Sequence, residues 1–294
     1  MTTHAPSIKL LAIDIDGTLL NPQKQITPRT RTAIQAARAA GIVVTLATAR
    51  RYRNTAPIAA ELATDIPLVL CDGALIMQDG RVLTTQQLKA EVAQETVELM
   101  VRRSIQPAVH HIIDDMEETW TGLEAYDNEW VVTYFSTFPE SIKRLDYAHC
   151  CARQPDPLRV VAFAPEDVIN ALIPEVAALS CSWNFTQRGS YGTAELTVMN
   201  PACSKASGVE LLAQSLGIEM QEVMAIGDNN NDLEMLQAAG WSVAMGQAPE
   251  TIKAVANVVT TSNAEDGVAL TIEHYVLGLD LQAASNSFKR LTCR

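Results

Sequence analysis

Short apolar segments recur near both ends of the chain, and segments with a helical pattern separate them. The apolar segments are Leu10 to Ile13, Ile42 to Ala47, Leu68 to Leu70, Val223 to Ile226 and Ser242 to Met245. Apolar runs without alternation are typical of strands that are buried on both faces. The pattern therefore predicts an α/β fold with a doubly wound parallel sheet, because helices follow the strands in order.

The helical segments between these strands carry start and stop signals. Thr27 can cap a helix that has Pro28 in its first turn and Gly41 after its end. Ser204 can likewise cap a helix that stops at Gly217. Strand and helix thus alternate as a parallel sheet requires.

The middle of the chain, residues 83–197, has a different pattern. It contains an amphipathic stretch near Leu88 to Met100, an aromatic-containing segment at Trp130 to Phe135 that we interpret as a strand, and a second strand at Leu158 to Ala164. This mixture predicts an α+β domain inserted into the α/β core.

The insertion would make the core discontinuous, with residues 1–82 and 198–294 building one sheet. The insert would then lie where strands end and ligands usually bind. The tail after Gly278 loses its apolar rhythm, so we expect a frayed terminus there and assign it no function.

Composition and charge narrow the possible partners. Apolar residues make up 48% of the chain and charged residues 19%, which is typical of a compact soluble protein. The 22 basic and 34 acidic residues give a formal net charge of −12, without any basic run, and this argues against a nucleic-acid partner. The same negative charge would repel a phosphorylated substrate at long range. Chemistry on a phosphate would therefore need local cations and a bound metal.

The six cysteines are scattered and form no CxxC pair, so we expect a reducing, cytoplasmic setting. The first residues lack a charged leader followed by a long apolar stretch, and no segment has about 18 uninterrupted apolar residues. We therefore expect neither export nor a membrane partner.

The strongest chemical signal is the DIDGT segment at residues 14–18, which follows the first apolar strand. It places the carboxylates of Asp14 and Asp16 at the carboxyl end of that strand, where ligands bind. Two carboxylates about 4 Å apart repel by about 4 kcal/mol at an effective dielectric near ~20, so they need a cation or a shared proton. Magnesium would satisfy them. The alternative is a capped strand end with a tight turn.

Three further segments weaken that alternative because they also follow predicted strands. Thr48 and Arg50 come after the second strand. Lys205 opens a helix after the predicted strand Glu195 to Met199, at a helix N-terminus that favours phosphate oxygens. The GDNNND segment at residues 227–232 follows the strand that begins at Val223.

Together these segments resemble the haloacid dehalogenase (HAD) superfamily, in its Cof-like branch with a large C2B-type cap. The resemblance covers nearly the whole chain. It rests on DIDGT at 14–18, TLATAR at 45–50, Lys205 after ELTVMNP, GDNNND at 227–232 and AMGQA at 244–248.

The resemblance implies catalytic roles for four residues. Asp14 would attack phosphorus and become a phospho-aspartate. Asp16 would act as acid and base, which requires a carboxyl that is protonated in the first step and ionised in the second. Thr48 would hydrogen-bond the transferring phosphoryl group, and Lys205 would offset negative charge.

The resemblance also implies a magnesium cofactor, Mg2+, held by Asp14, the backbone carbonyl of Asp16 and Asp228, with Asp232 directly behind these ligands. Asn231 would orient a substrate phosphate or a metal-bound water, and Arg50 would hold a substrate or approach the cap.

Three positions depart from the family pattern. Asp72 stands where relatives usually have the asparagine of NGA, Ala49 replaces a common glycine and Gln247 replaces a common asparagine. Asp72 adds a carboxylate near the phosphate end of the sheet. It would either change substrate preference or magnesium affinity, or only cap the backbone of its loop.

Two groups are expected to be structural. His110–His111 and His149–Cys151 lack zinc-site spacing, because neighbouring ligands do not readily converge on one ion. We expect the aromatic residues of the cap to pack its interior instead of forming a platform for a sugar. They are Trp120, Tyr126, Trp130 and Tyr134.

The sequence thus predicts a magnesium-dependent phosphatase that acts on a small phosphorylated metabolite. Sugar phosphates, pyridoxal phosphate and flavin mononucleotide are the substrate types that the resemblance implies, and the cap would determine which one binds. Alternatives are a phosphosugar mutase, a protein that binds a phosphometabolite without turnover, and a receiver-like signalling module. The oligomeric state is not readable from the sequence.

Overall fold

The computed structural model describes residues 7–63, 65–136, 142–187, 189, 192–279 and 289–290. The chain divides into two compact units, which we call the core and the insert. The core comprises Met1–Thr84 and Ser204–Arg294, and the insert comprises Thr85–Cys203. The sequence-based bounds at 83 and 197 differ from these by a few residues.

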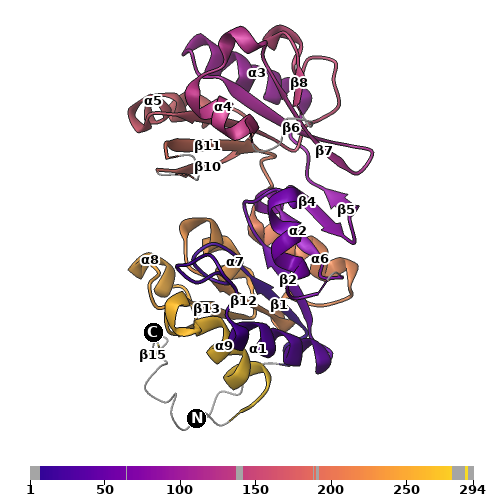
Figure 1. The fold of residues 1–294 in the computed structure, drawn as a ribbon, viewed down its shortest axis with the longest axis vertical. Helices are drawn as coiled ribbons and strands as arrows, with labels where there is room; N and C mark the ends of the chain where they lie inside the picture. Colours follow the sequence, from indigo (N-terminus) through magenta and orange to yellow (C-terminus); the bar gives the residue numbers. More distant parts are fainter. Residues whose placement is uncertain are drawn as a thin grey trace. The chain divides into compact units, whose positions relative to one another are not determined.

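The core contains one sheet of nine strands in the order β15-β14-β13-β12-β1-β2-β3-β4-β5 (Figure 1). Its six central strands, from β14 to β3, are parallel, whereas β15 and β4 pair antiparallel to their neighbours. The strands are β1 Leu10–Ile13, β2 Val43–Ala47, β3 Leu68–Leu70, β4 Leu75–Gln78, β5 Arg81–Thr85, β12 Val223–Gly227, β13 Trp241–Ala244, β14 Val258–Val259 and β15 Lys289–Arg290.

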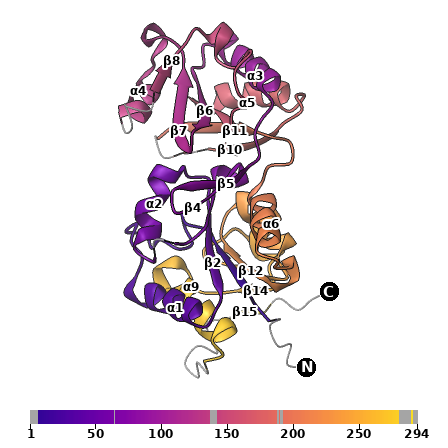
Figure 2. The same ribbon diagram turned by 90° about the vertical axis from the view of Figure 1, so that its right-hand side faces the viewer.

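Helices cover both faces of this sheet, as a doubly wound fold requires. They are α1 Pro28–Ala39, α2 Tyr52–Ala60, α6 Lys205–Ser215, α7 Leu233–Ala238, α8 Glu250–Lys253 and α9 Gly267–Thr271. Figure 2 shows α1 and α9 on one side of the sheet and α6 on the other. Val209 and Leu212 of α6 belong to the same apolar cluster as Leu10 and Ala12 of β1, so this face of the sheet is covered by apolar side chains.

The predicted caps form in the core. The Thr27 hydroxyl accepts a hydrogen bond from the Thr30 backbone N–H, and Pro28 is the first residue of α1. Ser204 caps α6 in the same way, through the Ser207 N–H. Both helices therefore begin where the sequence predicts.

The insert is an α+β unit with a sheet of six strands in the order β10-β11-β9-β6-β7-β8. Its strands are antiparallel except for the parallel pair of β7 and β8. Its elements are α3 Ala90–Arg102, β6 Pro107–Ile113, β7 Met116–Thr121, α4 Glu129–Ser136, β8 Ile142–Arg144, β9 Arg159–Ala164, α5 Glu166–Val176, β10 Ser182–Thr186 and β11 Ala194–Met199.

The two faces of the insert's sheet carry different apolar clusters. Helices α3 and α5 contribute Val97 and Leu172 to the larger cluster, which also contains Trp120 of β7. Helix α4 contributes Tyr134 to the smaller one, against which Trp130 is partly buried. These three predicted cap aromatics therefore pack the insert, as expected; nothing is described for the side chain of Tyr126.

The predicted strand Trp130 to Phe135 is wrong, because this segment forms helix α4. Its β-branched and aromatic residues favour a strand locally. However, the Asn128 side chain accepts a hydrogen bond from the Val131 N–H, which caps a helix at this point. Val131, Tyr134 and Phe135 then share one buried face at the i, i+3, i+4 spacing.

None of the helices in the described residues is long and apolar enough to cross a bilayer. In the tail beyond Gly278, Lys289–Arg290 pair with β14 as strand β15, which differs from the expected frayed terminus, whereas residues 280–288 and 291–294 lie outside the described residues.

Candidate active site

The carboxyl ends of β1, β2 and β12 place the candidate residues at one edge of the core sheet. Ile13 pairs with Leu46 of β2 and with Ile226 of β12, so the three strands end at the same level. Asp14 follows β1 directly, and its N–H donates to the Ile226 carbonyl. The segments that begin at Thr48 and Asp228 therefore leave the sheet beside Asp14.

Lys205 is the first residue of α6, and its side chain is buried beside two carboxylates. Its Nζ lies 2.7 Å from Asp14 Oδ1 and 2.6 Å from Asp232 Oδ1. The strand before it, β11, belongs to the sheet of the insert. Lys205 is therefore presented by the start of α6, the helix that the sequence predicts it to open.

The close approach of α6 to the 3-10 turn Cys71–Gly73 depends on two glycines. A Cβ at Gly73, whose φ is +94°, would lie 2.0 Å from the Ser204 carbonyl oxygen. A Cβ at Gly208 would lie 2.7 Å from Gly73 Cα. Larger side chains would push the first turn of α6, and with it Lys205, away from Asp14.

The charges of this cluster do not balance. Burial alone would lower the pKa of Lys205, but the carboxylates of Asp14, Asp232 and Asp72 raise it well above its usual value. The pKa of Asp14 is raised by burial and by the charge of Asp232, which Lys205 only partly offsets. One ammonium therefore serves several buried carboxylates, and the cluster lacks positive charge.

The donor atoms fit a divalent cation of the magnesium type. Asp14 Oδ2 is buried and has no hydrogen-bond partner among the described residues. Carboxylate oxygens of Asp14, Asp228 and Asp232 lie within 4.8 Å of one another. Burial and the charge of Asp232 raise the pKa of Asp228 to about 6, and a cation would relieve this penalty.

Hydrogen bonds occupy both carboxylate oxygens of Asp232. Its Oδ1 accepts from Lys205, and its Oδ2 accepts from the N–H groups of Asp228 and Asn229 at 2.9 and 3.0 Å. Asp228 is also held by the Thr18 hydroxyl, which donates to its Oδ1 at 3.1 Å. This leaves Asp14 Oδ2 and Asp228 Oδ2 as the more available oxygens.

Asp16 lies in a separate, exposed ion-pair group. Arg50 donates from Nε to Asp16 Oδ2 at 2.6 Å and from Nη2 to Asp16 Oδ1 at 2.7 Å, and Lys24 Nζ lies 3.2 Å from Asp16 Oδ1. Burial would raise the pKa of Asp16, but Arg50 and then Lys24 hold it below its usual value. Asp16 thus pairs with two cations, Arg50 and Lys24, in this group.

Thr48 and Asn231 lie at the same edge of the sheet. Thr48 is buried, and its Oγ1 accepts a hydrogen bond from the Arg50 N–H at 3.2 Å. The side-chain amide of Asn231 donates to Asp72 Oδ1 at 3.1 Å. Both side chains are therefore fixed by neighbours that belong to the predicted motifs.

Sequence reasoning assigned no role to Thr18, Lys24 or Gln247, all of which contact predicted site residues. The Gln247 side chain donates to the Gly17 carbonyl at 2.5 Å and makes a long, 3.5 Å contact with Asp228 Oδ2. Thr18 belongs to the DIDGT motif and could have been found from it. Nothing in the local sequence marks Lys24.

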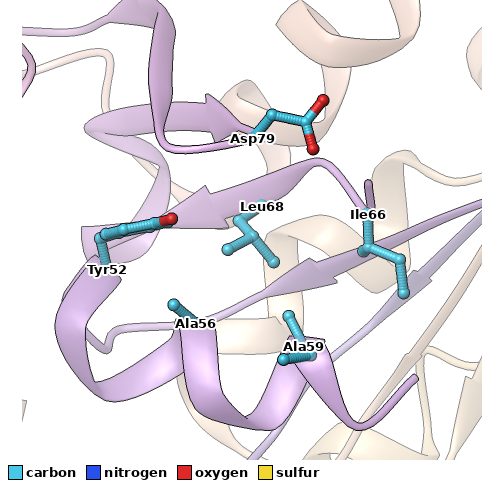
Figure 3. A pocket seen from close by; sticks show the side chains of 7 residues that line it. Tyr52, Ala56, Ala59, Ile66, Leu68 and Asp79 are labelled. Carbon is cyan, nitrogen blue, oxygen red and sulfur yellow. The ribbon is translucent and has the colours of Figure 1, made fainter. Parts of the chain in front are cut away.

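A pocket of about 390 Å³ lies elsewhere in the core, between α2 and the turn that joins β4 to β5 (Figure 3). Tyr52 and Asp79 stand at its border, and Ala56, Ile66 and Leu68 contribute apolar lining. None of its lining residues belongs to the acidic cluster around Lys205, so its chemistry is distinct from that of the candidate site.

A family model described as haloacid dehalogenase-like hydrolase matches residues 11–272 of the chain. The chain belongs to this family. Its relatives place it in the Cof-like branch of the HAD hydrolases, so the receiver-like alternative does not apply. A relative from Haemophilus influenzae is 31% identical over 271 residues, which cover 90% of this chain and 97% of the relative.

Two further relatives of this HAD hydrolase have names that state a substrate. The pyridoxal phosphate phosphatase of Escherichia coli is 26% identical and matches 92% of this chain and 99% of its own. A 5-amino-6-(5-phospho-D-ribitylamino)uracil phosphatase of Bacillus subtilis is 27% identical and matches 90% of this chain and 97% of its own.

Solved structures agree with this fold. A haloacid dehalogenase-like hydrolase from B. subtilis has a TM-score of 0.74 at 24% identity, covering 91% of this chain and 99% of that one. A HAD subclass IIB sugar phosphatase has a TM-score of 0.73 at 23% identity, covering 92% of this chain and 99% of that one. The α/β core with an α+β insert is thus the fold of this family.

Proposed function

We propose that this HAD hydrolase is a magnesium-dependent phosphatase that removes phosphate from a small metabolite through a phospho-aspartate on Asp14. The family and its phosphatase relatives make the chain a phosphoric monoester hydrolase. The observation that carries the proposal is the setting of Asp14. One of its oxygens is paired with the buried Lys205, and the other is buried without a partner.

In the first step, a carboxylate oxygen of Asp14 attacks phosphorus while the bond from phosphorus to the leaving oxygen breaks. The carboxyl of Asp16 gives its proton to that leaving oxygen. In the second step, water attacks the phosphorus of the acyl phosphate and gives a proton to Asp16, and this regenerates the Asp14 carboxylate. Thr48 and Lys205 hold the phosphoryl oxygens and offset their charge.

Asp16 must leave its present partners before it can act as the acid. Arg50 and Lys24 favour its ionised form, and a substrate phosphate that takes Arg50 would remove most of that stabilisation. The carboxyl would then be protonated more readily. Arg50 would thus bind the substrate and release Asp16 in the same movement.

The residues that would hold magnesium are Asp14, the backbone carbonyl of Asp16 and Asp228, with Asp232 positioning Asp228. When bound, the ion supplies the positive charge that Lys205 alone does not provide. Asn231 would orient the substrate phosphate or a water.

The substrate would be a small phosphorylated metabolite, and the relatives suggest which types to test first. They are sugar phosphates, pyridoxal phosphate and phosphoribitylamino-uracil compounds, to which the sequence resemblance adds flavin mononucleotide. The proposed role of the insert, residues 83–197 by the sequence, is to recognise the leaving group. The proposed location is the cytoplasm, where such metabolites occur.

Phosphate release from a panel of these compounds, with magnesium and with chelator, tests the proposal on wild type and Asp14→Asn. We expect release that requires the metal and is lost by at least about a thousandfold in the variant, because its amide is a far weaker nucleophile. The variant should keep its fold by circular dichroism. Undiminished turnover in Asp14→Asn would refute the phospho-aspartate.

The same panel separates the two remaining alternatives. Transfer of the phosphoryl group to a second sugar hydroxyl, without free phosphate, would favour a phosphosugar mutase. Calorimetric binding of a panel member without any turnover would favour a binding protein.

A further inference from the structure

Asp72 is a buried carboxylate that the proposed mechanism does not use. It lies in the 3-10 turn Cys71–Gly73, directly after β3, and its side chain is 2% exposed. Its φ of +54° is in the left-handed region, where aspartate and asparagine are tolerated better than most residues. Its N–H donates to the carbonyl of Thr48 at 3.0 Å, which places the turn against a candidate catalytic residue.

The Asp72 carboxylate faces the candidate site. Its Oδ1 accepts from the side-chain amide of Asn231 at 3.1 Å. Its charge also acts on the Lys205 ammonium, together with the charges of Asp14 and Asp232. Asp72 is thus one more acidic group near the buried Lys205 ammonium.

The formal charge of this cluster shows what Asp72 changes. Asp14, Asp72, Asp228 and Asp232 are acidic, and Lys205 is the one cation that pairs with Asp14 and Asp232 among the described contacts. An asparagine at position 72 could accept the same hydrogen bond from Asn231 without the charge. Aspartate therefore adds one negative charge to a site that must bind both a cation and an anion.

We propose that Asp72 is a specificity-determining residue that strengthens cation binding and weakens phosphate binding. The inference rests on the proposed function, because it assumes that the cation and the phosphate meet at Asp14. The extra charge attracts a divalent ion and repels a phosphate dianion, and each effect is large in a buried site. The hydrogen bond to Asp72 also turns the amide nitrogen of Asn231 toward position 72, so the amide oxygen points elsewhere.

The variant Asp72→Asn tests the charge while keeping the shape and the left-handed backbone. We expect the dissociation constant for Mg2+, measured by titration calorimetry on metal-free protein, to rise about tenfold. We expect the inhibition constant of inorganic phosphate, measured at saturating Mg2+, to fall about tenfold. Opposite shifts in the two constants are the signature of a charge effect.

Asp79→Asn is the matched control. Asp79 also has a left-handed backbone, with φ of +51°, but it is exposed and borders the pocket of Figure 3. The same substitution there should leave both constants within about twofold, because exposed charges are screened. Asp72→Gly is a second variant for the site. It tolerates the same backbone and should shift both constants in the directions of Asp72→Asn.

Three results would overturn the inference. If wild type releases phosphate with Mg2+ but neither constant changes in Asp72→Asn, only the inference about Asp72 fails. If both constants move in the same direction, or if Asp79→Asn has the same effect, Asp72 acts through structure and not through charge. If wild type neither binds Mg2+ nor releases phosphate, the proposed function and the inference fail together.

Discussion

Lys205 of the core and His111 of the insert are both almost fully buried, and their pKa values move in opposite directions. Lys205 of the core is 2% exposed, and its pKa is raised by three carboxylates against the effect of burial. His111 of the insert is 1% exposed, and burial and then the charge of Lys143 lower its pKa to about 4. Burial is thus the same in both, and the neighbours differ.

The neighbours of His111 explain why it stays neutral. Its ring stacks on Trp120 with centroids 3.8 Å apart, and neither ring nitrogen has a hydrogen-bond partner among the described residues. The Lys143 ammonium lies over the Trp120 ring, 3.8 Å from its centroid. Burial without a hydrogen-bond acceptor, and then the charge of Lys143, therefore favour the neutral imidazole.

The comparison shows that two buried basic groups differ because their neighbours differ. The core retains a buried cation because the proposed chemistry needs positive charge beside Asp14, and the fold supplies acidic partners for it. The insert uses a buried histidine as an apolar, stacking side chain. A perturbed pKa therefore marks the candidate site in the core, whereas in the insert it marks packing.

The largest effect is expected when Lys205 is replaced by methionine. Asp14 and Asp232 would remain buried without their cation, which should lower the free energy of unfolding by about 3–5 kcal/mol and kcat by at least about a hundredfold. Urea unfolding and steady-state kinetics measure the two effects. A loss of stability below about 1 kcal/mol would contradict the view that Lys205 holds these carboxylates together.

A control variant and a double variant test this prediction further. Lys9→Met breaks an exposed ion pair with Glu222 and should change stability by less than about 1 kcal/mol. Adding Asp232→Asn to Lys205→Met removes one uncompensated charge, so part of the lost stability should return without any recovery of activity.

The variant His111→Phe tests whether His111 is buried as a neutral ring, through the pH dependence of stability. The pKa of His111 is lower in the folded protein than the ordinary histidine value of 6.5, so the unfolded state binds more protons as pH falls through the window from 6.5 to 4. Wild type should lose about 2 kcal/mol of stability from this group between pH ~7.5 and ~5, and the variant should not. Urea unfolding at both values measures the difference.

The exposed His149 of the insert provides the matched control, because His149→Phe should leave the pH dependence of wild type unchanged. Equal slopes for wild type and His111→Phe would mean that His111 is not buried as a neutral ring.

The smallest effect on stability is expected at the exposed ion-pair group. Arg50→Ala should change the free energy of unfolding by less than about 1 kcal/mol, because exposed pairs contribute little. Its kcat/KM should nevertheless fall by about tenfold or more if Arg50 binds the substrate phosphate. Lys24→Ala, which removes only the longer contact to Asp16, should change kcat/KM less. Equal effects of the two substitutions would argue against a substrate role for Arg50.

Local sequence predicted the buried strands and capped helices of the core, and in the insert it was wrong at one aromatic segment. Leu10–Ile13 and Leu68–Leu70 form the strands that their apolar runs predict, and Thr27 and Ser204 cap their helices. Buried parallel strands and capped helices leave strong local signals. The sequence did not predict helix α4, because its residues suit a strand as well as a helix. The packing of this segment against one face of the insert's sheet favours the helix.

The sequence by itself determined which residues are available for the chemistry. The order and spacing of the motifs predict the residues that the core brings to one edge of its sheet, since parallel strands end together. The contact between Lys205 and Asp14 joins residues 191 positions apart. It was implied by family resemblance, not by any local pattern.

Which side chains pair with each charged group depends on the tertiary structure. It pairs Asp16 with Arg50 and Lys24, and it directs Asp72 toward Asn231. It also leaves both ring nitrogens of His111 without a hydrogen-bond partner in the described residues. These outcomes depend on how distant segments pack and on how much water each group keeps, and neither is encoded in a short stretch of sequence.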